Sequence, residues 1–196
     1  ILIATTGENS GARPPGMEKP EFIAARDDEA LRAARMLGVP FDRIHFGHPY
    51  TNGLGRVPDG ALDVPAAIDL LDAWLTELGP GTWVKTHSSF EVPGVRHSDH
   101  VNLGKAAAEL LATGTIPENG LRFYVEPYQL SAFETAYPTV GLMVEFPNSH
   151  AEIVRRALRE YAALDGVGSK FGFGYKSVRS AFDQVLHDPT NYAHLP

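Results

Sequence analysis

Short apolar runs alternate with longer amphipathic segments along this chain of 196 residues, and this alternation constrains the fold more than any other feature. The runs at 1–5, 43–47 and 82–87 predict strands. The segments at 20–37 and 64–78 predict helices. Strands that alternate with helices form βαβ units, whose sheet is mainly parallel and covered on both faces. We therefore expect an α/β fold, a three-layer α/β/α sandwich with a mainly parallel, Rossmann-like sheet.

The second half of the sequence continues the pattern. Further strands are predicted at 121–126 and 139–146, and helices from Ser98 and over 148–164. The tail predicts a turn and a last short helix. We find no internal repeat and no low-complexity linker, so we expect one domain over residues 1–196.

Composition excludes several classes of function. The net charge is −7 without a run of Lys or Arg, so no nucleic-acid partner is expected. The absence of cysteine excludes disulfides, thiolate catalysis and zinc sites built on Cys. No apolar run is long enough to span a bilayer, so we expect no membrane partner. We expect a cytoplasmic protein. Association into a homo-oligomer is left open.

The predicted strands place a group of polar residues at one edge of the sheet. Loops that follow the carboxyl ends of parallel strands share that edge, which is where α/β proteins bind ligands. The loops after residues 5, 47 and 87 carry Glu8, His48, Asn52, His87, His97, Asp99 and His100.

The segment His-x-Asp-His at 97–100 lies where a helix is about to begin. His97 and His100 are three residues apart and share a helix face, so both imidazoles can approach one centre. Asp99 can orient an imidazole through its ring N–H. Catalytic zinc takes three protein ligands, of which this segment supplies at most two. The alternative is a plain helix start with Ser98 as the N-cap and exposed histidines, and the spacing alone leaves both open.

The stretch "VKTHSSFEVPGVRHSDHVNLGKAAAEL" (84–110) resembles the second signature of the PIG-L (LmbE-like) family of zinc-dependent N-deacetylases. "ATTGENSG" (4–11) resembles the Thr-x-Gly-Glu segment of that family, and "ARDDEALRAARMLGV" (25–39) its Arg-x-x-Glu helix. The resemblance covers residues 1 to about 112 in register.

This resemblance implies a Zn²⁺-dependent hydrolase that removes an N-acetyl group from a small-molecule amino sugar. His100 would be the metal ligand, and His97 the general acid that protonates the leaving amine. Asp99 would orient His97. The residues expected near the substrate are Glu8, Arg26, Asn52 and His87.

The sequence also departs from the family pattern. The family's first motif, Ala-His-Pro-Asp-Asp, supplies a His and an Asp to zinc and another Asp as the base, and no such motif occurs here. We expect a longer native protein that carries this strand-helix unit, and weak zinc binding by residues 1–196 alone. Some members have a Tyr where this chain has Val95, so no oxyanion role is transferred to that position.

Three alternatives remain open from the sequence. One is a metal triad of His87, His97 and His100, although we expect His87 to line the pocket. The second is a catalytically inactive sugar-binding or interaction domain, and the third is an amidase that cleaves a thiol-cofactor conjugate. The other histidines are expected to be structural (His45) or at the surface (His150, His187 and His194).

Overall fold

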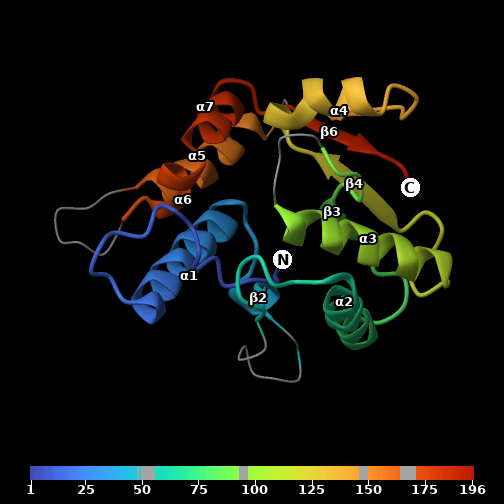
Figure 1. Cartoon of the computed structure of the whole chain (residues 1–196), viewed down its shortest axis with the longest axis horizontal. Helices are drawn as coiled ribbons and strands as arrows, with labels where there is room; N and C mark the ends of the chain where they lie inside the picture. Colours follow the sequence, from blue (N-terminus) through green and yellow to red (C-terminus); the bar gives the residue numbers. More distant parts are fainter. Residues whose placement is uncertain (48, 50–55, 93–96, 146–149, 164–170) are drawn as a thin grey trace.

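A computed structural model describes the chain except residues 48, 50–55, 93–96, 146–149 and 164–170 (Figure 1). Its helices are α1 (Lys19–Met36), α2 (Val64–Leu78), α3 (Ser98–Ala112), α4 (Leu130–Ala136), α5 (Ala151–Ala162), α6 (Phe173–Ser177) and α7 (Arg179–His187). Short 3-10 turns are η1 (Phe41–Arg43) and η3 (Pro127–Gln129). Among the described helices, none combines the length and the apolar character that crossing a bilayer requires.

The described strands form two sheets. β1 (Leu2–Ile3) pairs with β2 (His45–Phe46) in parallel. The second sheet has the order β3-β4-β6-β5, built from β3 (Val84–His87), β4 (Leu121–Val125), β6 (Asn191–His194) and β5 (Met143–Glu145). In it, β3 and β4 are parallel, whereas β6 is antiparallel to both β4 and β5.

The α/β class is therefore confirmed, and the second sheet is mixed. Its two antiparallel pairings both involve β6, a strand that the sequence analysis did not predict. The polar tail gave no alternating pattern from which to predict it. The predicted strand at 139–146 is described over Met143–Glu145 and lies beside β6. The mainly parallel sheet stays a prediction.

β1 lies between two layers of helices. Side chains alternate across a strand, so neighbouring residues face opposite layers. Leu2 and Ala4 pack against the core cluster that α2 and α3 form with β3 and β4. Ile1 and Ile3 instead line a small apolar cavity with residues of α1 and α5. This part of the molecule is thus an α/β/α arrangement, in which α1 and α5 run side by side (Figure 1).

A buried carboxylate joins the C-terminal helices to α1. Glu29 is only 1% exposed and accepts hydrogen bonds from the backbone N–H groups of Phe173 (2.6 Å) and Gly174 (2.8 Å). Arg26 forms an ion pair with the same carboxylate at 3.4 Å. Burial raises the pKa of Glu29, and the N–H donors and Arg26 oppose that rise. These contacts fix α6, and with it α7, relative to α1.

Gly104 allows α3 to pack directly on the end of β3. A Cβ at this position would come within 2.7 Å of the carbonyl oxygens of His87 and Ser88. Both neighbours are backbone atoms, which cannot move aside as a flexible side chain can. The absence of a side chain at Gly104 therefore lets the second turn of α3, one turn beyond His100, come close to the last residue of β3.

We expect Gly104→Ala to lower the free energy of unfolding by about 1–3 kcal/mol, because overpacking outweighs the higher helix propensity of alanine. Chemical denaturation measures this change. Gly11→Ala is the control, since a Cβ there meets no atom within 4 Å. A Gly104→Ala protein as stable as the control would contradict this account of α3 packing.

Candidate metal centre

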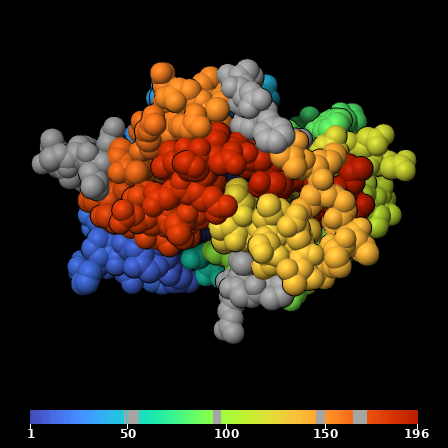
Figure 2. All heavy atoms as spheres, turned by 90° about the horizontal axis from the view of Figure 1, so that it is seen from above, coloured from blue at the N-terminus to red at the C-terminus, as the bar shows by residue number. Residues whose placement is uncertain are grey.

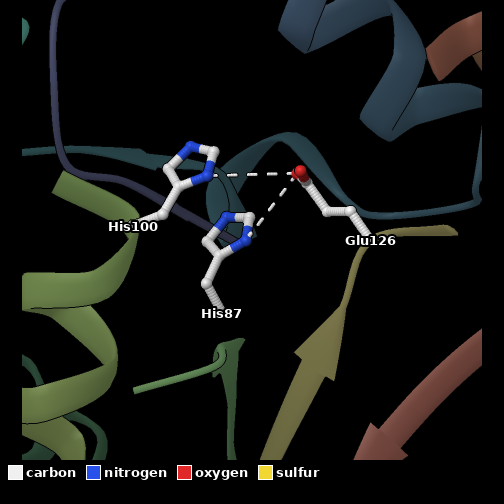
Figure 3. Close-up of side chains that lie close together, drawn as sticks. All are labelled: His87, His100 and Glu126. Carbon is white, nitrogen blue, oxygen red and sulfur yellow. Dashed lines mark ion pairs between the residues drawn. The ribbon is translucent and has the colours of Figure 1, made fainter. Parts of the chain in front are cut away.

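Two strand ends and one helix start bring His87, His100 and Glu126 together (Figure 3). His87 is the last residue of β3, and Glu126 follows directly after β4, the parallel neighbour of β3. His100 lies in the first turn of α3. Oε1 of Glu126 is 3.8 Å from Nδ1 of His87 and 3.9 Å from Nδ1 of His100. The two imidazole rings stack with centroids 3.7 Å apart.

Both imidazoles are held in the neutral form. Burial lowers the pKa of His87, although the Glu126 carboxylate opposes this effect. Burial also lowers the pKa of His100, to about 3, and the neighbouring His87 and His97 add to the decrease. Neutral imidazole and ionised carboxylate are the forms that bind a metal ion, so no proton has to leave these rings at neutral pH.

The three residues fit a catalytic zinc site. One ligand atom from each of His87, His100 and Glu126 lies within 4.8 Å of the others. Tetrahedral zinc with bonds near 2.1 Å places its ligand atoms roughly 3.4 Å apart, so small side-chain rotations would close the set. Two His and one Glu leave the fourth position to water, as in known zinc hydrolases.

The sequence analysis predicted His100 as a metal ligand and His87 as a pocket residue, and the structure places the two rings against each other. It did not single out Glu126. One signal was available, because Glu126 ends the predicted strand 121–126 at the ligand edge. An acidic residue at a strand end is too common to be selected without its spatial neighbours.

His97 lies beside a second carboxylate, that of Asp59. His97 is the residue before α3 and its Nε2 is 3.8 Å from Oδ1 of Asp59. Its ring also stacks on His100, with centroids 4.2 Å apart. Burial raises the pKa of Asp59, and His97 opposes that rise. The sequence analysis paired His97 with Asp99, whose carboxylate lies in the same group, within 4.8 Å.

Asp99 holds the loop that carries Asp59. It is 3% exposed and accepts hydrogen bonds from the backbone N–H groups of Gly60 (2.8 Å) and Leu62 (3.2 Å). Glu8 supports the same loop from the other side, since it accepts hydrogen bonds from Thr6 and from the N–H of Asp59 (3.1 Å). Burial raises the pKa of Glu8, but these hydrogen bonds outweigh it and the net shift is downward.

A cavity of about 550 Å³ opens in front of His97 and His100. Its polar lining includes Thr5, Asn9, Ser10, Arg26, Asp59 and Glu126. Residues of α5 and α7 also line the cavity. Of the residues predicted near the substrate, Arg26 lines this cavity, whereas Glu8 is buried and does not. Asn52 lies outside the described residues.

The predicted surface position of His194 was wrong. It was expected at the surface of a polar tail, yet it is 1% exposed. As part of β6 it hydrogen-bonds Ser88 Oγ through Nε2 at 2.9 Å and stacks on Phe123 and Phe133. Burial lowers its pKa. His194 therefore acts as a core residue.

The comparisons with known proteins add no family. A scan against protein-family models, a search of curated proteins and a search of solved structures each found no significant match.

We expect Asp99→Asn to lower the free energy of unfolding by about 1–3 kcal/mol, because its amide can accept from only one side and leaves a buried N–H without an acceptor. Denaturant titration of the metal-free protein measures the loss. Asp72→Asn, at an exposed position of α2, is the matched control for removing a carboxylate from a helix. Equal stability of the two variants would show that Asp99 does not hold the 59–62 loop.

Proposed function

We propose that this protein is a zinc-dependent amide hydrolase of the PIG-L (LmbE-like) type, which removes an N-acetyl group from a small molecule containing an amino sugar. The observation that carries the proposal is the joint opening of His97 and His100 onto one cavity, beside a three-ligand set for a metal. Chemistry and geometry of the donors support zinc as the cofactor.

His100 would hold the zinc with His87 and Glu126. The resemblance instead implies a His and an Asp from a first motif that this sequence does not contain. His100 belongs to both sets. When bound, zinc would polarise the acetyl carbonyl and lower the pKa of a water molecule.

The remaining steps fall to side chains around the cavity. His97 would donate a proton to the leaving amine nitrogen, and its neighbour Asp59 would stabilise the charged ring before the transfer. A carboxylate must accept the proton of the attacking water. Asp59 lines the cavity and has a raised pKa, which suits a base, while the resemblance assigns this step to an Asp of the first motif.

The polar wall would bind the sugar. Arg26 can donate to a hydroxyl or acyl oxygen, since Glu29 fixes its guanidinium at the cavity. Asn9 and Ser10 offer further hydrogen-bonding groups on the loop that follows β1. Groups of this kind suit a small molecule better than a polymer, and the proposal places this enzyme of small-molecule metabolism in the cytoplasm.

The proposal also includes the more specific fold, a three-layer sandwich with a mainly parallel, Rossmann-like sheet. β1 pairs with β2, and β3 with β4, but the two pairs lie in separate sheets. A parallel strand between β1 and β3 would join them into one Rossmann-like sheet within a three-layer sandwich. Val57 contacts that edge of β1 at Thr5 through a single bridge, so such a strand would have to displace it.

Substitutions of His97 and His100, at the start of α3, should impair the protein in different ways. His100→Ala removes a metal ligand, so zinc content and deacetylation should fall together. His97→Ala leaves the ligand set intact, so zinc content should remain while turnover falls by about 10²–10⁴-fold, the usual contribution of a positioned acid. The measurement is zinc content and amine release from N-acetylglucosamine conjugates, on the same purified variants.

His187→Ala on α7 is the matched control, because that histidine is exposed and outside the cavity lining. If His97→Ala loses zinc and His100→Ala keeps it, the two roles are reversed. If wild type binds zinc and sugar without releasing amine, the protein is the inactive sugar-binding domain.

A further inference from the structure

The cavity in front of His97 and His100 has two chemically different walls. One wall carries the polar groups of the β1 loop, α1 and the α3 start. The other comes from the C-terminal helices and is mainly apolar, although Ser177 of α6 also belongs to it. It consists of Leu158 on α5 and a stripe formed by Val178, Ala181, Phe182 and Val185 at the start of and along α7. Figure 2 shows α6 and α7, in orange-red and red, beside the yellow and gold surface near η3 and α4.

The stripe follows helical spacing. At 100° per residue, Val178, Ala181, Phe182 and Val185 fall on one face. The opposite side of α7 carries Arg179 and Asp183, which form an ion pair at 3.6 Å. α7 therefore turns its apolar face to the cavity and its charged face away from it.

The protein itself buries the apolar face only in part, with Phe182 packed against the rings of Tyr161 and Tyr175. No residue of α7 is buried, and Val178 is 46% exposed. A sugar and an acetyl group would find few polar partners on this side. Apolar surface that lines a ligand cavity gains its stabilisation when a ligand removes it from water, at about 25 cal/mol per Å².

We propose that the substrate carries an apolar substituent, an alkyl or aryl group, that binds against the α7 stripe while its amide lies at His97 and His100. This inference deepens the proposed function and rests on it. The substituent could belong to the group attached to the sugar or to the acyl chain, since both reach from the amide across the same cavity.

Binding measurements on analogues of the sugar half and of the acyl half show which half of the substrate carries the apolar substituent. Hexyl and methyl β-glucosaminide represent the sugar half, and hexanoate and acetate represent the acyl half. None of the four is hydrolysed, so binding is measured on the zinc-loaded protein by calorimetry independently of activity. If the longer chain lies on the stripe, the longer compound of one pair should bind at least about tenfold more tightly than the shorter compound of that pair. The reason is that each buried methylene strengthens binding about fourfold.

Substitutions in the stripe test whether α7 is responsible for the tighter binding of the longer probe. Val178→Ser should reduce the ratio of the two affinities several-fold, with a larger loss when Val185→Thr is added. Val144→Ser is the matched control, because Val144 on β5 is also 46% exposed but does not line the cavity. It should leave the ratio unchanged.

A preference in the glucosaminide pair supports an apolar group on the sugar, and one in the acid pair supports a longer acyl chain. Equal affinities of the longer and the shorter probe in both pairs would overturn the inference. It would also be overturned if Val144→Ser reduced the affinity ratio as much as Val178→Ser does. Amine release from acetylated substrates tests the hydrolase separately. Hydrolysis without a hexyl preference defeats only this inference, whereas a hexyl preference without hydrolysis defeats only the proposed function.

Discussion

The close contact between α3 and the end of β3 determines the geometry of the whole site. Gly104 permits it, because any side chain there would collide with the carbonyl groups of His87 and Ser88. The contact sets the first turn of α3 beside the strand end, so that the His100 ring stacks on that of His87. Parallel pairing of β3 with β4 then places Glu126 at the same edge. The candidate ligands thus follow from one helix–strand approach and one strand pairing.

A second set of contacts places the proton-transfer groups. Asp99 uses its carboxylate to hold the N–H groups of Gly60 and Leu62, and Glu8 holds that of Asp59. The loop is fastened on both sides, which fixes Asp59 next to His97. Glu8, which the sequence analysis placed near the substrate, and Asp99, which it placed beside His97, therefore also stabilise this loop. Their substitution should affect the stability of the protein as well as catalysis.

Periodicity was sufficient to predict the elements in the first part of the chain. α1, α2 and α3 appear where apolar spacing and helix-start residues indicate them, and β1 to β4 appear within the predicted runs. Alternation of strand and helix also predicted the shared edge, and with it the proximity of His87, His97 and His100. Each of these predictions depends on local pattern, which a single sequence contains.

Long-range pairing was beyond the sequence. β6 and the burial of His194 depend on a tail strand that inserts between β4 and β5, and nothing local in "NYAHLP" indicates that partner. The same holds for the α7 wall of the cavity, since Glu29 must first anchor the backbone of Phe173 and Gly174, which follow it by 144 and 145 positions. Asp59 and Glu126 were missed for this reason, because their roles arise only from their neighbours in space.

The central claim is that the edge where β3, β4 and α3 meet binds a metal ion through His100. Anomalous diffraction at the zinc edge, from crystals of the zinc-loaded protein, tests it most directly. We predict one peak about 2.0–2.2 Å from a ring nitrogen of His100, with His87 and Glu126 at comparable bond lengths. A fully loaded crystal with zinc elsewhere and none at His100 would contradict the account.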